Sequence, residues 1–160
     1  MPAPLPVEIV PLAREHYRDL FKIVKVVEPF KGFQYYDQFC QNLEKREGFT
    51  YWMDGKLVGL ISFSDYFPGV SVMIHMVFDP EHKEAMNRRV IRHIFDYAFN
   101  KLNVHRVNTY SIKGVTDGVV KFIKRVGFVR EGCLREAVEL ADGLFDLILY
   151  GMLRKDCQWL

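Results

Sequence analysis

The stretch from residue 70 to residue 112, VSVMIHMVFDPEHKEAMNRRVIRHIFDYAFNKLNVHRVNTYSI, carries the pattern on which the rest of the interpretation depends. Residues 70–78 form an apolar, β-branched run typical of a strand, and Asp79-Pro80 ends it. From about residue 85 to residue 102, apolar side chains recur at helical spacing and share one face. Residues 104–112 predict another strand. A strand, a helix and a strand of these lengths predict a crossover that places the two strands side by side and parallel.

Two helices are expected before this unit. After a short strand at residues 7–10, apolar residues from about Leu12 follow helical spacing, and Pro29 predicts the end of that helix. Residues 36–43 repeat the helical spacing, and Gly48 predicts the end of this second helix.

The segment between these helices and residue 70 has the character of strands. Residues 49–53 and 56–64 are rich in apolar, aromatic and β-branched side chains, and the Asp54-Gly55 pair between them is a strong hairpin signal. Phe67-Pro68-Gly69 predicts a second turn. Together with strand 70–78, these segments predict a meander of three antiparallel strands.

Beyond residue 112 the sequence predicts a short helix and a final hairpin. Thr116 or Asp117 is expected to cap the helix, which carries Val119, Phe122, Ile123 and Val126 as inward residues, and Gly127 is placed to end it. Residues 128–140 and 144–153 predict two long strands joined by a turn at 141–143. The expected order is β-α-α-β-β-β-α-β-α-β-β, in a single α/β domain over residues 1–160.

The composition favours an ordinary globular protein. The net charge is only +2, from 22 basic and 20 acidic residues, which argues against a nucleic-acid-binding protein. Three cysteines without a CxxC pair and five histidines without metal-ligand spacing predict neither a disulfide framework nor a metal site. No signal-peptide pattern or membrane-spanning apolar run is present, so we expect a cytoplasmic protein without a membrane partner.

A series of short motifs in the second half of the chain carries a family resemblance. The motifs are D-Y-A-F at 96–99, L-x-x-H-R-V at 102–107, R-V-G-F-V-R-E-G at 125–132, L-R-E at 134–136, Asp142-Gly143 and Asp146. In this order they resemble the GNAT N-acetyltransferases, and most of all the branch that modifies ribosomal-protein N-termini. The resemblance covers roughly residues 48–156 and is strongest over 90–155.

The resemblance implies a fold and a reaction. The fold is one GNAT-like domain, a central mixed, twisted sheet of about seven strands with helices on both faces. Strands 70–78 and 104–112 should part at their C-terminal ends, so that the backbone of Met76, Val77 and Phe78 can pair with the pantetheine arm of acetyl-CoA. The reaction is direct transfer of an acetyl group from acetyl-CoA to an amine of a protein or a small molecule, without a metal. We expect a monomer or a homodimer.

The loop that should bind the pyrophosphate departs from the family pattern, Q/R-x-x-G-x-G/A. Here residues 82–87 have the pattern H-x-x-A-x-N, without glycine, and the loop is about one residue shorter. Glu84 should repel a phosphate, whereas Lys83, Arg88 and Arg89 would attract it. The alternative is a plain helix start with a solvated basic face. The candidate cofactor-binding residues are Met76, Val77, Phe78, His82, Lys83, Ala85, Asn87, Arg88, Arg89 and Thr116.

The catalytic residues are less well marked. Family members protonate the departing thiolate with a Tyr or a Ser, and Ile123 and Val119 stand at those positions here. His75 and Glu136 are the candidate general bases, the alternatives being a core histidine and a strand-face ion pair. Asp146, Tyr110 and Ser111 are weaker candidates for the base, and Cys133 is the weakest candidate of all, as a nucleophile.

Two functions follow. The first is an acyl-CoA-dependent N-acetyltransferase with slow turnover, in which the helices of residues 12–47 and the final hairpin shape the acceptor pocket. The second is a catalytically inactive GNAT-fold protein, viral or accessory, that acts by binding a protein partner.

Overall fold

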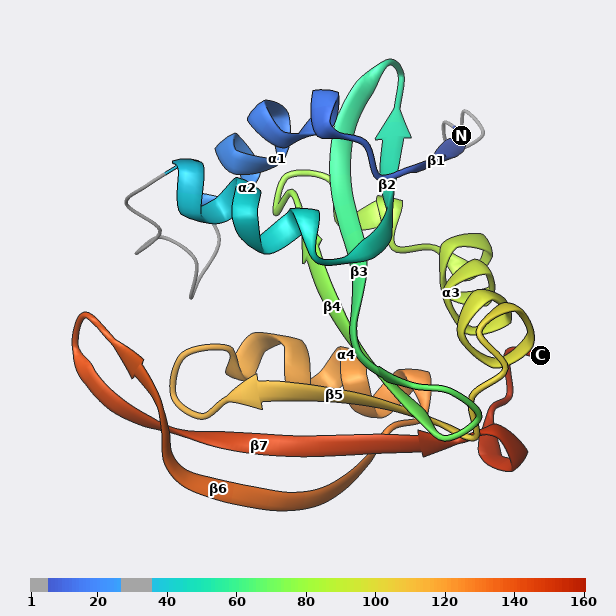
Figure 1. Cartoon of the computed structure of the whole chain (residues 1–160), viewed down its shortest axis with the longest axis vertical. Helices are drawn as coiled ribbons and strands as arrows, with labels where there is room; N and C mark the ends of the chain where they lie inside the picture. Colours follow the sequence, from blue (N-terminus) through green and yellow to red (C-terminus); the bar gives the residue numbers. More distant parts are fainter. Residues whose placement is uncertain (1–5, 27–35) are drawn as a thin grey trace. The chain divides into compact units, whose positions relative to one another are not determined.

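The computed structural model describes residues 6–26 and 36–160. Strands hydrogen-bond in the order β1-β2-β3-β4-β5-β7-β6, so the seven-stranded sheet expected from the sequence is confirmed (Figure 1). The sheet is mixed, because β4 pairs with β5 in parallel, whereas the pairs β1–β2, β2–β3, β5–β7 and β6–β7 are antiparallel. The strands are β1 (Val7–Pro11), β2 (Glu47–Met53), β3 (Lys56–Phe67), β4 (Ser71–Phe78), β5 (Arg106–Ile112), β6 (Val129–Leu140) and β7 (Gly143–Leu153).

The helices are α1 (Tyr17–Val24), α2 (Tyr36–Glu44), α3 (Arg88–Asp96) and α4 (Val120–Val126). The element order predicted from the sequence is therefore confirmed. Within the described residues, no helix is both long enough and apolar enough to cross a membrane. The chain divides into two compact units, one made of Met1–Ser64 with His75–Ile94 and the other of Asp65–Ile74 with Phe95–Leu160.

The first unit places helices on both faces of strands β1 to β3. Neighbouring residues of a strand face opposite sides, and β2 shows this directly. Trp52 packs against the apolar cluster of α1 and α2, and its ring meets His16 at 5.5 Å. Tyr51 faces the other way, toward α3, where its hydroxyl lies 3.3 Å from Nδ1 of His93. Leu20 of α1 is completely buried in the cluster on the Trp52 side.

The second unit is built on the antiparallel strands β5, β7 and β6, with β7 in the middle (Figure 1). Phe95 stacks on Phe99 with ring centroids 6.1 Å apart and also contacts Phe128. Helix α4 ends at Gly127, whose φ of 118° is the left-handed conformation that favours glycine. The predicted stop for this helix is therefore confirmed.

Strands β4 and β5 run parallel, as predicted. Their register pairs Ser71 with Arg106, Val72 with Val107 and Met73 with Asn108, and it extends no further along the described residues. Both strands continue beyond this short ladder, to Phe78 and Ile112. The paired register therefore ends before the last residue of either strand.

Several predicted boundaries were wrong. Helix α1 ends at Val24, before the expected end near Pro29, which lies outside the described residues. The helix expected from residue 85 starts at Arg88, because a separate 3-10 turn, η3 (Lys83–Ala85), precedes it, and its last turn is a π-helical segment, η4 (Tyr97–Lys101). Gly48 belongs to strand β2 and does not end a helix.

The start of the last helix also differs from the prediction. Thr116 makes no side-chain capping bond, because its hydroxyl accepts a 2.7 Å hydrogen bond from the N–H of Ile112 behind it. The side chain of Asp117 is also bonded to the segment before the helix, since its Oδ1 accepts a hydrogen bond from the N–H of Gly114. Val119, expected to point inward, is 46% exposed.

Candidate cofactor and active site

The candidate cofactor residues of the first unit follow one another along the end of β4, the loop 79–87 and the start of α3. The side chains at the end of β4 are largely used by the core. Val77 is buried in the cluster formed with α1 and α2. The ring of Phe78 packs on Tyr51 at 5.6 Å and occupies space that a side chain at Gly59 would need. Val77 and Phe78 can therefore offer a ligand their backbone more readily than their side chains.

Asp79 fixes the beginning of the loop. Its carboxylate accepts hydrogen bonds from the N–H of Glu81 at 3.0 Å and from Nδ1 of His82 at 3.1 Å, and it pairs with Nζ of Lys56 at 3.4 Å. Partial burial acts to raise the pKa of Asp79, but the hydrogen bonds from Glu81, His82 and Lys56 outweigh it and hold the pKa below its usual value. The carboxylate is therefore charged at neutral pH.

The middle of the loop needs no glycine. None of the residues 79–87 has a positive φ, so an ordinary L-residue fits each position of the backbone. Ala85 is completely buried, which turns its methyl group into the protein interior. Its N–H donates to the carbonyl of His82 at 3.0 Å, which closes the turn η3. The predicted cofactor residue Ala85 is thus an anchor of the loop.

Asn87 caps the start of α3, at the position where the family loop pattern has a small residue. Oδ1 of Asn87 accepts a 3.1 Å hydrogen bond from the N–H of Val90. The N–H groups of Arg88 and Arg89, in the first turn, have no partner within the helix, and the helix dipole makes this end electropositive. A helix start of this kind suits an anion.

The basic side chains around this helix start differ in their availability. Nη1 of Arg89 donates to the carbonyl of Val7 in β1, so this guanidinium is engaged in holding the edge strand. Arg88 and Lys83 are exposed, and neither side chain makes a hydrogen bond or ion pair with another residue in the described part of the chain. Of the three, Arg88 and Lys83 are the more accessible to a phosphate.

His75, the first candidate base, lies in the middle of β4. Its Nε2 is 2.7 Å from the Ser64 hydroxyl of β3, and its side chain is half-buried. The ring nitrogen that carries the proton sets which group donates in this pair. A histidine fixed by a hydroxyl at one nitrogen has a defined orientation, which suits either a base or a structural role.

The other predicted site residues belong to the second unit. Glu136 has a φ of 49°, and its N–H donates to Oδ1 of Asp146 at 2.9 Å. Ser111 is buried with its hydroxyl 3.2 Å from that of Tyr150. Cys133 is exposed, and no group of three or more possible metal ligands exists within the described residues. Thr116 is held by Ile112, as above.

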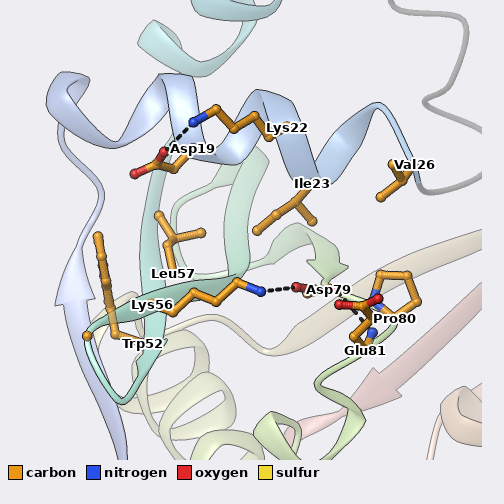
Figure 2. Close-up of a pocket in the computed structure, with 11 residues that line it drawn as sticks. Asp19, Lys22, Ile23, Val26, Trp52, Lys56, Leu57, Asp79, Pro80 and Glu81 are labelled. Atoms are coloured by element: carbon orange, nitrogen blue, oxygen red, sulfur yellow. Dashed lines mark hydrogen bonds and ion pairs between the residues drawn. The ribbon is translucent and has the colours of Figure 1, made fainter.

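A pocket of about 630 Å³ lies in the first unit, beside the loop start (Figure 2). Its apolar lining includes Ile23, Trp52 and Leu57, and its charged lining includes two pairs, Lys22 with Asp19 and Lys56 with Asp79. None of the individually named candidate site residues lines this pocket, although part of its lining comes from the segment 12–47 that was expected to help shape the acceptor pocket. The signal that could have drawn attention to Asp79 is an Asp in a turn directly after a strand, because an Asp side chain often accepts a hydrogen bond from the backbone N–H two residues later.

Comparison with known proteins adds a family and a fold. A family model described as acetyltransferase (GNAT) domain matches residues 15–149. The curated Probable N-acetyltransferase YjcK of Bacillus subtilis (strain 168) is 24% identical over 110 residues, which are 64% of this chain and 60% of that protein. The chain therefore spans less than two thirds of the length of this relative.

Solved structures give the same fold. A chimera of spermidine N-acetyltransferase SpeG from Vibrio cholerae and hSSAT matches with a TM-score of 0.76 at 21% identity, over 93% of this chain and 96% of that one. A mutant form of the Vibrio cholerae SpeG matches with a TM-score of 0.78 at 18% identity, over 96% of this chain and 97% of the other. At these identities the likeness concerns the fold.

Proposed function

The chain belongs to the GNAT acetyltransferase family, and from this premise we propose that it transfers an acetyl group from acetyl-CoA to a primary amine. The observation that supports this most is the short parallel ladder of β4, which pairs with β5 only at Ser71–Met73. The later residues of β4, Met76–Phe78, keep backbone groups on that edge of the strand for a pantetheine arm. Their side chains are largely held in the core, which favours recognition through the backbone.

The loop and the start of α3 carry groups that support a phosphate site. The first turn of α3 offers the N–H groups of Arg88 and Arg89. The side chains of His82, Lys83 and Arg88 add positive or hydrogen-donating groups. The absence of glycine is no obstacle to the backbone path, because no residue from 79 to 87 needs a positive φ. The buried Ala85 leaves the face of the loop free of a large side chain.

The catalytic part of the proposal assigns proton transfers. Bound acetyl-CoA supplies the thioester that the amine attacks. The amine must first lose a proton, and His75 is the proposed base, because an imidazole titrates near neutrality and this one is held by Ser64. Glu136 is the alternative base. A β4 N–H near Val77 is proposed to stabilise the oxyanion. Water supplies the proton for the leaving thiolate, since Val119 and Ile123 cannot.

The acceptor is a primary amine of a small molecule or a protein. SpeG is named as a spermidine N-acetyltransferase, so spermidine belongs in the substrate panel beside monoamines, amino acids and peptides with free N-termini. Because a general acid contributes about 10²–10⁴-fold, we expect turnover below the ordinary range of about 1–10³ per second.

The test combines binding and turnover. Acetyl-CoA at about 100 times its dissociation constant should stabilise the protein by about 2.7 kcal/mol in a thermal melt. Release of free CoA should require one class of amine, and His75→Ala should lower kcat by about 10²-fold or more. His105→Ala is the matched control, because His105 is exposed. If Glu136→Gln abolishes turnover and His75→Ala does not, the base is Glu136.

A second function is favoured by one observation: the two positions that carry a thiolate acid in relatives are held here by Val119 and Ile123. Under this alternative the chain keeps the GNAT fold and binds a protein partner without catalysis. A melt that acetyl-CoA leaves unchanged, together with no CoA release for any amine, would support this function and contradict the first.

A further inference from the structure

Asp79 lies at the junction of strand β4 and the glycine-free loop. Only 12% of its side chain is exposed, and three donors converge on its carboxylate: the N–H of Glu81, Nδ1 of His82 and Nζ of Lys56. Figure 2 shows the Lys56 side chain extended toward this carboxylate. The side chain therefore ties the loop to the β2–β3 hairpin.

The backbone of the same residue makes two further connections. The N–H of Asp79 donates to the carbonyl of Val58 in β3 at 2.8 Å, and its carbonyl accepts from the N–H of His82 at 2.9 Å. His82 is thus held twice by Asp79, through its backbone and through its ring. A single residue sets both the path of the loop and the orientation of the imidazole.

The chemistry of the His82 ring follows from this contact. With Nδ1 bonded to a carboxylate, Nε2 is the ring nitrogen that remains for a ligand. Nε2–H donates to an anion when the ring carries a proton on both nitrogens, and Nδ1–H keeps its bond to Asp79 in that form. A carboxylate that accepts from Nδ1–H fixes the orientation of the ring. The Asp79 carboxylate that contacts this ring is also paired with Lys56.

We propose that Asp79 is a positioning residue of the acetyl-CoA site: it holds loop 79–87 and orients the His82 ring so that Nε2 is presented to the pyrophosphate. This inference rests on the proposed function. It explains how a loop without glycine keeps a phosphate-binding form. Side chains anchor it at three points, with Asp79 at its start, the buried Ala85 in its middle and the Asn87 cap at its end.

The direction of the change in coenzyme A affinity distinguishes a positioning role of Asp79 from an effect of its charge. Asp79 is negative, so removing it should strengthen the binding of an anion if its charge alone mattered. A positioning role predicts the opposite. Because a hydrogen bond to a charged group is worth about tenfold in affinity, Asp79→Ala should weaken the binding of coenzyme A by about tenfold. Asp79→Asn keeps an acceptor for Glu81 N–H and should lose less.

The experiment is a calorimetric titration of the full chain with two probes, coenzyme A and pantetheine, which lacks the pyrophosphate. We expect Asp79→Ala to weaken the binding of coenzyme A and to change the affinity for pantetheine by no more than about twofold. Asp142→Ala, the same chemical change at an exposed turn, is the control and should leave both affinities unchanged. Should Asp79→Ala fail to fold in a thermal melt, Asp79→Asn carries the test.

A double-mutant cycle with His82→Gln tests the connection to the imidazole. If Asp79 acts through His82, the double variant should bind coenzyme A about as well as the weaker single variant. Additive losses, equal losses for both probes, or tighter binding of coenzyme A by Asp79→Ala would overturn the inference. If the unsubstituted protein binds no coenzyme A, the proposed function fails instead.

Discussion

At the scale of single residues, Gly48 and Gly118 illustrate opposite uses of glycine. A Cβ at Gly48 would lie 2.3 Å from the carbonyl oxygen of Ile61 in the neighbouring strand, which is backbone and cannot move aside cheaply. Gly118, in a short 3-10 turn, has nothing within 4 Å of its Cβ position and no positive φ. Substitution of these two glycines by alanine should therefore change the free energy of unfolding in opposite directions.

We expect Gly48→Ala to lower the free energy of unfolding by about 1–3 kcal/mol, the usual cost of overpacking. Gly118→Ala should raise it by about 0.4–1 kcal/mol, because alanine restricts the unfolded chain. Urea denaturation of both variants measures the difference. Equal stability of the two variants would show that β2 and β3 separate easily at Gly48.

Tyr51 carries a prediction about alkaline pH. Its side chain is completely buried, and this burial raises its pKa well above the usual value for tyrosine. In the unfolded chain a tyrosine ionises near pH 10. Above that pH the unfolded state loses a proton that the folded state retains, so folding becomes less favourable as pH rises.

The contribution of Tyr51 to stability should accordingly be constant below about pH 10 and decrease above it, by at most about 1.4 kcal/mol per pH unit. Tyr51→Phe removes the ionisable group and keeps the ring in the core. The free energy of unfolding of both proteins is measured from neutral to alkaline pH. Above about pH 10, the value for the unsubstituted protein should fall relative to that of Tyr51→Phe. Parallel curves over this range would contradict the prediction.

The residues that sequence patterns identified and missed differ in a consistent way. Gly127 was predicted to end α4 because glycine reaches a positive φ at no cost, and the structure agrees. Asp79 was treated only as a strand terminator, although its bonds to Glu81 and His82 are local. Its ion pair with Lys56 joins segments that lie far apart in the sequence, and such a contact leaves no local pattern.

At the scale of secondary-structure elements, helix α3 depends on the Asn87 cap. The Asn87 side chain satisfies the N–H of Val90, which has no acceptor within the first turn. Asn87→Ala should lower the free energy of unfolding by about 1 kcal/mol, whereas Asn87→Asp should retain most of the cap. Thermal melts of the two variants test this, and equal losses would show that the amide oxygen is not the stabilising group.

Element boundaries were predictable where a local signal existed. Asp54-Gly55 forms the expected hairpin, and both residues have positive φ. The irregularity in β6 had no such signal. Its register passes from Leu134 opposite Leu147 to Val138 opposite Phe145, so that residues 135–137 lie opposite Asp146. The carboxylate of Asp146 accepts the N–H of Glu136 there, which stabilises a conformation that alternation of apolar and polar residues cannot reveal.

At the scale of the whole molecule, the chain passes between the two compact units inside continuous elements. The divisions fall between Ser64 and Asp65 in β3, between Ile74 and His75 in β4, and between Ile94 and Phe95 in α3. The family match over residues 15–149 also extends across both units. We therefore propose that residues 1–160 unfold as one domain.

The two tryptophans allow this proposal to be tested directly, because Trp52 belongs to the first unit and Trp159 to the second. The variants Trp159→Phe and Trp52→Phe each leave one tryptophan as a reporter of its own unit. If a shared strand or helix loses its hydrogen bonds in one unit, the other unit loses support, so unfolding should be all-or-none. Within each variant, the fluorescence and far-ultraviolet circular dichroism transitions in urea should have the same midpoint. A fluorescence midpoint that departs from the circular dichroism midpoint in either variant would mean that the units unfold separately, and that the chain is two domains in thermodynamic terms.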